Sequence, residues 1–251
     1  MHNLGYILND YRQKYVFHKD VLLHYLKYGI SKRFDKSVDL EQKTIPKILH
    51  YCWFGHGKYS EKIQRCVESW HKVLPEYQFM LWNEDNFPPE KGLYPFAEQA
   101  LKDRKWAFVS DVARLYALYT VGGVYVDTDV EMLKPLDEFL NYDFFSSFES
   151  KRYVPTGLMA AKKGNPYIKY LLAWYEKKSY SGKDYYEIAN TKIITKLTKL
   201  ATAIRLNNTK FQFGNNIFFP YNYFCPENIG DNTFNITEKT YCIHHITGSW
   251  G

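Results

Sequence analysis

The sequence contains no apolar run of the about 18 residues that a transmembrane helix needs. Its N-terminus also lacks the charged segment followed by an apolar segment that is typical of a signal peptide. We therefore expect a cytoplasmic protein. A long basic run and the common nucleic-acid-binding motifs are absent as well, so we expect no nucleic-acid partner.

Cysteine is scarce, with 4 residues in a chain of 251. Cys52, Cys66, Cys225 and Cys242 form no Cys-x-x-Cys pair, which argues against a zinc site and favours buried free thiols. A chain of this length can bury roughly 70–75% of the surface that its unfolded form exposes. It therefore needs no disulfide bonds for stability.

Aromatic residues and positive charge are what the chain has in excess. Phe, Trp and Tyr make up 18% of the residues, and the net charge is +6. Aromatic side chains usually fill a core, but they also stack on sugars and bases. The charge fits an anionic partner such as a nucleotide or a phospholipid surface, and it fits a solvated basic surface without a partner equally well.

The chain divides near residue 43. Val21, Leu22, Tyr25, Leu26 and Ile30 follow helical spacing, so we predict a helical extension and linker over residues 1–43. That helix either packs on the rest of the protein or docks on a membrane or a partner. We predict one further domain over residues 44–251.

Strand and helix patterns alternate along this second part. We expect strands at 45–54, 77–82, 124–126, 143–148, 157–161 and 241–245, and helices at 60–74, 96–104, 108–120, 166–177 and 186–201. Such alternation is typical of an α/β fold, here with a mixed, mostly parallel sheet.

Two carboxylates follow the apolar strand at 124–126. Asp127 and Asp129 are two residues apart, so in an extended chain they point to the same side. Ligands bind beyond the carboxyl ends of strands in open α/β sheets, and two carboxylates there suit Mg²⁺ or Mn²⁺. An Asp-x-Asp motif alone is common by chance, so its place after a strand carries the argument.

A second pair lies one helix upstream. Asp111 and Arg114 are three residues apart, on one face of the expected helix. They form either a local ion pair of little energetic weight or two polar anchors for a hydroxylated ligand beside the acidic pair.

These segments together resemble a known family. The runs SDVAR at 110–114 and GGVYVDTD at 122–129 are similar to the signature of the DXD-containing sugar transferases of glycosyltransferase family thirty-two, which also occurs in the glucosylating domains of the large clostridial toxins. The run IPKILHYCWFG at 45–55 resembles the opening strand of that family, and HHITGSW at 244–250 resembles its closing segment. The resemblance covers residues 44–251.

The resemblance implies a GT-A fold, a nucleotide-sugar donor, a divalent metal and retention at the anomeric carbon. The donor would be a UDP-sugar, and the acceptor a saccharide or lipid-linked saccharide. A role in the synthesis of bacterial capsular or surface polysaccharide would place the protein in the cytoplasm, with peripheral contact to the inner face of the membrane left open.

Site residues carry over by position. The resemblance gives donor-binding roles to Tyr51, Trp53, Asn83, Ser110, Asp111, Arg114, Tyr125, Asp127, Ser249 and Trp250. It gives metal-binding roles to Asp127, Asp129 and His245, and catalytic roles to Asp111, Arg114, Asp127, Asp129 and Trp250. For Asn83 a plain turn residue, and for His245 a buried core histidine, are the alternatives.

Three alternatives compete with this interpretation. A haloacid-dehalogenase-like phosphatase also has Asp-x-Asp after a strand, but it has Thr or Val where this chain has Glu131. A nucleotidyltransferase has its glycines further from the acidic pair than Gly122 and Gly123 are from Asp127 in this chain. A catalytically inactive carbohydrate-binding relative would keep the fold without turnover. No other carboxylate stands out as a nucleophile, so we prefer front-face attack in which the leaving phosphate takes the acceptor's proton.

Overall fold

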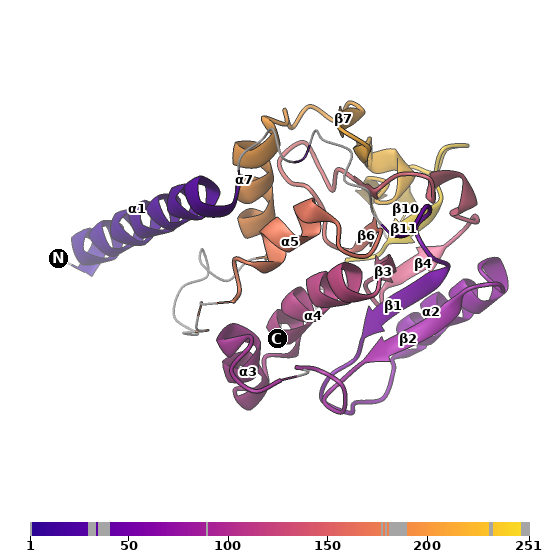
Figure 1. Ribbon diagram of the computed structural model, residues 1–251, viewed down its shortest axis with the longest axis horizontal. Coiled ribbons are helices and arrows are strands. Elements are labelled where there is room, and N and C mark those ends of the chain that lie inside the picture. Colours follow the sequence, from indigo (N-terminus) through magenta and orange to yellow (C-terminus); the bar gives the residue numbers. More distant parts are fainter. Residues whose placement is uncertain are drawn as a thin grey trace.

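A seven-stranded sheet forms the centre of the protein (Figure 1). The structure is a computed structural model, and it describes residues 2–29, 34, 41–88, 90–176, 178, 180, 190–230 and 233–246. The strands of the sheet are β1 (Ile48–Cys52), β2 (Gln78–Trp82), β3 (Gly123–Val126), β5 (Phe144–Ser147), β6 (Leu158–Ala161), β7 (Phe211–Phe213) and β8 (Asn216–Phe219).

The strand order is β2-β1-β3-β6-β5-β8-β7. Strands β6 and β7 run opposite to the other five, so the sheet is mixed and mostly parallel, as predicted. Two small two-stranded sheets complete the β-structure. One pairs β4 (Val130–Met132) with β11 (Cys242–His244), and the other pairs β9 (Asn228–Gly230) with β10 (Thr233–Phe234).

The described helices agree well with the sequence patterns. They are α1 (His2–Tyr28), α2 (Glu61–Val73), α3 (Pro95–Lys102), α4 (Trp106–Thr120), α5 (Pro166–Leu172) and α7 (Asn190–Thr202), with short 3-10 turns η2 (Asp137–Phe139) and η3 (Tyr221–Tyr223). Residues 186–189, which we expected to begin α7, lie outside the described residues. Strands β4 and β7 to β10, of two to four residues each, were not predicted.

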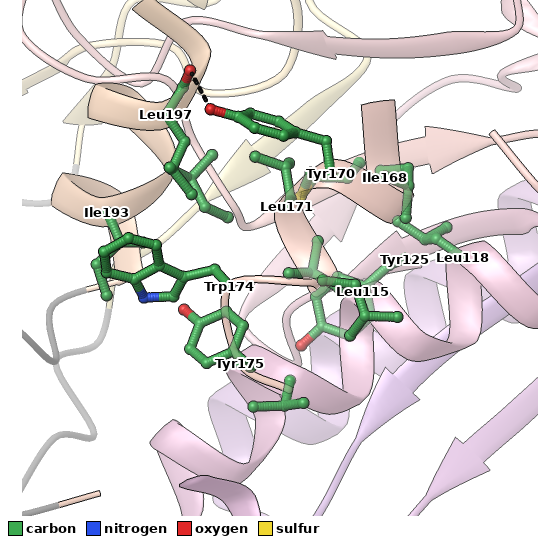
Figure 2. Packing of buried hydrophobic residues seen from close by; sticks show 14 of the residues in the cluster. Leu115, Leu118, Tyr125, Ile168, Tyr170, Leu171, Trp174, Tyr175, Ile193 and Leu197 are labelled. Atoms are coloured by element: carbon green, nitrogen blue, oxygen red, sulfur yellow. Dashed lines mark hydrogen bonds between the residues drawn. The ribbon is translucent and has the colours of Figure 1, made fainter. Parts of the chain in front are cut away.

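Helices cover both faces of the sheet, and strand residues alternate between two hydrophobic clusters. In β3, Tyr125 belongs to the cluster that contains α4, whereas Val124 and Val126 belong to the cluster that contains Trp70 of α2. Successive strand side chains point to opposite faces, so each face has its own core. Figure 2 shows how α4, α5 and α7 share the first of these clusters.

The turn from α4 into β3 requires two glycines. Gly122 and Gly123 have φ angles of +78° and +124°, which side chains other than glycine adopt poorly. A Cβ atom on Gly123 would lie 2.5 Å from the carbonyl oxygen of Ile48. This turn therefore fixes the close pairing of β3 with β1, and with it the place where β3 ends.

Helix α1 extends away from the sheet in Figure 1. Its buried face contributes Phe17, Val21 and His24, and the imidazole Nε2 of His24 lies 2.9 Å from the carbonyl oxygen of Tyr170 in α5. The predicted N-terminal helix is therefore present, and it packs on the rest of the protein. All four cysteines are free and buried, as expected.

Candidate active site

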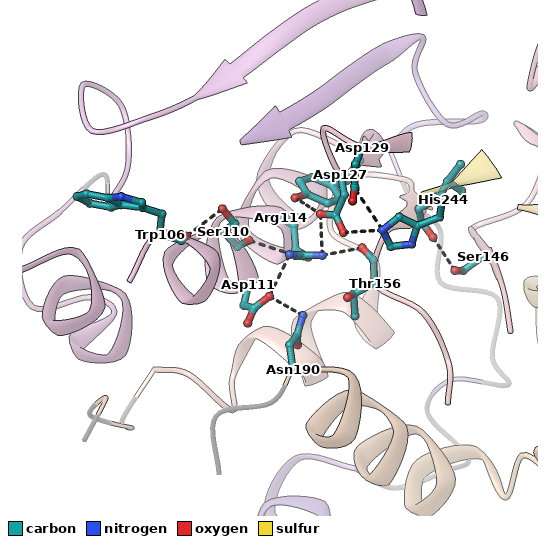
Figure 3. Close-up of polar contacts among 12 residues, drawn as sticks. Trp106, Ser110, Asp111, Arg114, Asp127, Asp129, Ser146, Thr156, Asn190 and His244 are labelled. Carbon is teal, nitrogen blue, oxygen red and sulfur yellow. Dashed lines mark hydrogen bonds and ion pairs between the residues drawn. The ribbon is translucent and has the colours of Figure 1, made fainter. Parts of the chain in front are cut away.

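The end of strand β3 carries a cluster of two carboxylates and an imidazole. Asp127 directly follows β3, and its backbone N–H donates to the carbonyl oxygen of Gly157 at 2.8 Å. Strand β11 pairs with β4 so that His244 lies opposite Val130. This pairing places one ligand atom each from Asp127, Asp129 and His244 within 4.8 Å of one another (Figure 3).

The His244 imidazole lies between the two carboxylates. Its Nε2 is 3.2 Å from Asp129 Oδ1 and 3.8 Å from Asp127 Oδ2. Burial alone would lower the pKa of His244, but its hydrogen bond to Asp129 and the two carboxylate charges outweigh burial and raise the pKa well above 6.5. The cluster therefore favours a positive charge at this point.

These donors fit a divalent cation. Two carboxylate oxygens and one imidazole nitrogen are a usual donor set for Mn²⁺, and a bound metal displaces the proton from such a histidine. Asp129 is 9% exposed and the His244 side chain is 12% exposed, so the donors are held in place before any ion binds.

A glycine makes room for the imidazole. A Cβ atom on Gly157 would lie 2.5 Å from Cε1 and Nδ1 of His244, closer than real Cβ contacts allow. Gly157 also accepts the hydrogen bond from Asp127 described above. The backbone at Gly157 therefore positions both an acid and the base of the cluster.

Arg114 links α4 to this cluster. Its Nη1 lies 3.2 Å from Asp127 Oδ1 and donates to the carbonyl oxygen of Thr156 at 2.7 Å, and its Nη2 donates to Asp111 Oδ1 at 2.9 Å. The guanidinium also lies 4.8 Å from the ring centre of Tyr125. Arg114 is 4% exposed, so these contacts replace water almost completely.

Asp111 lies behind Arg114. It is 0% exposed, and its Oδ1 also accepts from the side-chain amide of Asn190 at 2.9 Å. Burial raises the pKa of Asp111 to about 7 against the lowering effect of Arg114. Its Oδ2 is buried without a hydrogen-bond partner among the described residues.

The hydroxyl of Tyr125 completes the polar network. It donates to Asp127 Oδ1 at 2.8 Å. Burial raises the pKa of Tyr125 well above 10, so the phenol stays a hydrogen-bond donor at neutral pH. Asp127 is therefore oriented by Tyr125 and Arg114 together.

A cavity of about 690 Å³ opens onto this network, within the size range of small-molecule sites. Its lining includes aromatic, acidic and basic side chains from six segments of the chain, among them Trp53, Trp106, Phe108, Ser110, Arg114, Tyr125, Asp127, Asp129, Glu149, Asn190 and His244. Trp53 is half-buried, and its indole N–H donates to the carbonyl oxygen of Gly57 at 2.7 Å. A flat ring fixed at the wall offers a face for stacking.

Most of the predicted site residues meet at this cavity. Trp53, Ser110, Arg114, Tyr125, Asp127 and Asp129 line it. Asp111 does not line it but hydrogen-bonds to two residues that do, Arg114 and Asn190. Tyr51 and Asn83 do not line it: the Tyr51 ring packs 5.4 Å from Trp70, and Asn83 Oδ1 accepts from the backbone N–H of Asp85 within a turn. Ser249 and Trp250 lie outside the described residues.

His245 is not part of this cluster in the structure. Its Nε2 lies 2.9 Å from Glu131, whereas His244 stands between Asp127 and Asp129. Neighbouring residues of an extended segment point to opposite sides, so only one of the two histidines can join the cluster. The sequence alone does not say which.

Sequence analysis missed His244, Glu149, Thr156 and Asn190. Thr156 contributes a backbone carbonyl, which leaves no residue-type signal, and Asn190 lies 79 residues from its partner Asp111. The adjacent histidines were visible, but the pairing of β11 with β4 that selects His244 was not.

Residues 60–145 match the sequence profile described as "Glycosyltransferase sugar-binding region containing DXD motif". The chain is 26% identical over 139 residues to inositol phosphoceramide mannosyltransferase 3 of Schizosaccharomyces pombe, covering 51% of this chain and 36% of that protein. It is 25% identical over 189 residues to subversion of eukaryotic traffic protein A of Legionella pneumophila, covering 63% of this chain and 29% of that protein. The chain thus spans well under half the length of both relatives.

Among solved structures, the PaToxG glycosyltransferase superposes with a TM-score of 0.52 and 20% identity, covering 76% of this chain and 79% of that one. This likeness concerns the fold, and it confirms the GT-A α/β architecture. The Asp-x-Asp pair lies inside the matched segment 60–145, at the end of β3. The sequence match over residues 60–145 and this fold together support a DXD-containing glycosyltransferase.

Proposed function

We propose that the protein transfers a sugar from a nucleotide-sugar donor to a hydroxyl group of an acceptor, with Mn²⁺ or Mg²⁺ bound by Asp127, Asp129 and His244. The observation that carries this proposal is the cluster of these three side chains at the wall of a cavity that also contains Trp53. A nucleoside diphosphate suits both features of that cavity. Its phosphates can bind a metal ion at the cluster, and its base can stack on the ring of Trp53.

The chemical problem of this reaction is the negative charge that develops on the leaving diphosphate. A divalent ion at the cluster would neutralise part of that charge. Arg114 holds Asp127 in position, and the Tyr125 hydroxyl orients the same carboxylate. These contacts are already made in the structure, so no reorganisation is needed when the donor binds.

We propose a UDP-sugar as donor, with the base stacked on Trp53. This part rests on the resemblance and on the position of the Trp53 ring in the cavity wall. The relatives named mannosyltransferases make a mannose-containing donor the second choice, so both classes belong in the same assay. Retention at the anomeric carbon, a saccharide or lipid-linked acceptor, the cytoplasmic location and the setting of capsular polysaccharide synthesis stay predictions.

Helix α1 supports a peripheral contact with a membrane. Its solvent side exposes Tyr15 (70%), Leu22 (48%), Leu23 (53%) and Leu26 (65%), on the face opposite to the buried Val21. No described helix is long and apolar enough to cross a bilayer. Apolar side chains flanked by Lys19 and Lys27 suit the surface of an anionic bilayer.

Vesicle flotation tests this contact. Binding to vesicles with anionic lipid should exceed binding to neutral vesicles, and replacing Leu22 and Leu26 by Ser should abolish it while the enzyme stays folded. Equal recovery of the wild type and the variant from anionic vesicles would contradict the membrane contact. A dimer that buries the exposed side of α1 would also contradict it.

The transfer activity is tested by incubating the protein with a panel of UDP- and GDP-sugars and measuring the released nucleotide with Mn²⁺ and with EDTA. Nucleotide release should require the metal, and it should occur with sugars of one nucleotide, either UDP or GDP. Asp129→Asn should abolish release, whereas the matched variant Asp85→Asn, in the exposed turn after β2, should retain it. Metal-independent release, or full activity of Asp129→Asn, would contradict the proposal.

A further inference from the structure

A second cavity adjoins the first on the other side of His244. Its volume is about 540 Å³, and Glu149, His244 and Ile246 line both cavities. The rest of its wall comes from the loop after β5 and from the segment around β9 and β10, and it consists of Ser150, Lys151, Arg152, Tyr221, Cys225, Pro226, Glu227, Asn228, Phe234 and His245. A molecule bound here would meet a donor sugar beside the acidic cluster.

The loop that carries Glu149 is fixed at both ends. Phe148 and Val154 are 0% exposed. The backbone N–H of Phe148 donates to Phe219 at 2.9 Å, and that of Glu149 donates to the carbonyl oxygen of Tyr153 at 3.1 Å. The place of the Glu149 side chain at the junction of the cavities is therefore built into the fold.

The Glu149 carboxylate is close enough to the cluster to interact with it. Burial raises its pKa, the His244 charge lowers it, and Asp127 raises it. Among the described residues, no side chain or backbone group donates a hydrogen bond to this carboxylate. It is thus an acceptor placed between two cavities, in reach of a hydroxyl group in either.

Phe234 and His245 pack against each other in the wall of the second cavity. The Phe234 ring meets the His245 ring edge-on, with 5.3 Å between centroids, and Glu131 holds His245 from the other side. An aromatic ring fixed in this way can pack against the C–H face of a sugar or polyol ring. Tyr221 lies in the same wall and directs its hydroxyl to Glu227 at 3.5 Å.

Positive charge lies at the outer part of this cavity. Lys151 and Arg152 are consecutive and exposed, and neither forms an ion pair with any residue of the described chain. Arginine binds phosphate through two parallel N–H groups, which makes it the usual partner of a phosphate ester. The half-buried Glu149 lies at the inner end of the cavity, and the exposed Lys151 and Arg152 lie at its outer end. This arrangement fits a ligand with a hydroxyl group at one end and an anionic group at the other.

We propose that this second cavity binds the acceptor, that the acceptor is a sugar or polyol carrying a phosphate group, and that Glu149 accepts a hydrogen bond from its reacting hydroxyl. This inference rests on the proposed transfer function. The phosphate belongs either to a soluble sugar phosphate or to a lipid headgroup, and Lys151 and Arg152 bind it in both cases.

The transfer step balances without further reagents. The acceptor hydroxyl oxygen forms a bond to the anomeric carbon, and the bond from that carbon to the diphosphate oxygen breaks. The electron pair of that bond stays on the diphosphate, which takes the proton from the attacking hydroxyl. Glu149 orients that hydroxyl and returns to its initial state.

Binding measurements test the ligand class. Calorimetric titrations in UDP and Mn²⁺ should show that glucose 6-phosphate, or vesicles of phosphatidylinositol, bind at least tenfold more tightly than glucose. Preference for the first probe indicates a soluble acceptor, and preference for the second a lipid headgroup. Lys151→Ala with Arg152→Ala should remove that advantage. The proposal is wrong if neither phosphorylated probe exceeds glucose, or if the double variant binds them like the wild type.

Kinetics test the role of Glu149. With the preferred probe as acceptor, Glu149→Gln should lower kcat by at least tenfold while the affinity for UDP with Mn²⁺ changes by less than threefold. Glu68→Gln, at an exposed position of α2 that lines neither cavity, is the matched comparison and should lower kcat by less than threefold. Equal losses in the two variants would overturn the assignment of Glu149.

The two proposals fail in different ways. Absence of metal-dependent nucleotide release by the wild type would contradict the transfer function. The calorimetric preference for a phosphorylated polyol is measured without turnover, so it judges the acceptor cavity independently.

Discussion

Arg114 contacts Asp127 across the end of strand β3, with 3.2 Å between Nη1 and Oδ1. The same guanidinium is paired with a second carboxylate, that of Asp111, within its own helix. One buried cation therefore balances two acids. This arrangement ties the helix before the Gly-Gly turn to the acidic pair after it, so that stability and the geometry of the site depend on the same side chain.

Loss of Arg114 should reduce both stability and transfer. Arg114→Ala leaves Asp111 buried without its partner, and breaking such a pair costs about 3–5 kcal/mol. Because the pKa of Asp111 is already near 7, adding Asp111→Asn should restore part of the stability. Urea unfolding of the single and double variants measures this.

The activity of the same variants separates two roles of Arg114. We expect sugar transfer by Arg114→Ala to slow more than the affinity for the bare nucleotide diphosphate falls. A double variant that regains stability but not transfer would support a role at the site. Equal losses for donor and bare diphosphate would instead place Arg114 on the phosphates.

Replacing Gly157 should displace His244 from the metal-binding cluster. In Gly157→Ala, the new methyl group would overlap the His244 ring, so the imidazole must move away from Asp127 and Asp129. We expect the affinity for Mn²⁺ to fall by at least about tenfold, or 1.4 kcal/mol, with the fold retained. Manganese titration followed by electron paramagnetic resonance gives the affinity.

A double-mutant cycle shows whether Gly157 acts through His244. If it does, Gly157→Ala should have little further effect on Mn²⁺ affinity once His244 is replaced by Ala. Additive losses would mean that the methyl group disturbs the site through the backbone at Asp127 instead.

Removal of the Trp53 ring should weaken nucleotide binding by about 1–3 kcal/mol, the usual contribution of stacking between a base and an aromatic ring. Calorimetric titration of UDP with Mn²⁺ into Trp53→Ala measures the change. Trp53→Phe keeps a ring at the cavity wall, so it should recover most of the affinity. A variant that loses stability but binds UDP normally would show that the ring serves packing alone.

His50 should make the protein less stable as the pH falls. It is 0% exposed, donates from Nε2 to the carbonyl oxygen of Gly122 and accepts at Nδ1 from Trp82, so it is held neutral. Burial lowers the pKa of His50 to about 4. Between pH 6.5 and 4 the unfolded chain binds a proton that the folded protein does not, so about 3 kcal/mol of stability is lost over this range.

The comparison with His50→Gln isolates this effect. Glutamine can keep one donor and one acceptor but does not titrate, so the free energy of unfolding of the variant should fall less steeply between pH 6.5 and 4. Urea unfolding at several pH values gives both slopes. Identical slopes for the wild type and the variant would show that His50 is not the titrating group.

Much of the main architecture could be predicted because it depends on local patterns. The apolar strand before Asp127, the glycines at 122 and 123 and the amphipathic pattern of α4 are all readable along the chain. The N-terminal helix was predicted too. However, Leu22 and Leu26, which we grouped with Val21, lie on its exposed side, because a helix with apolar residues all round gives no sign of which face will pack.

The sequence by itself determined which residue types would meet at the end of β3: a pair of acids, an arginine one helix earlier and an aromatic ring after β1. The tertiary structure alone decided which of two adjacent histidines joins the acids, because the register of β11 on β4 sets which side each faces. It also decided that Asn190 supports Asp111 and that Glu149 stands between two cavities. Those contacts join segments far apart in the chain, and only packing of the completed sheet brings them together.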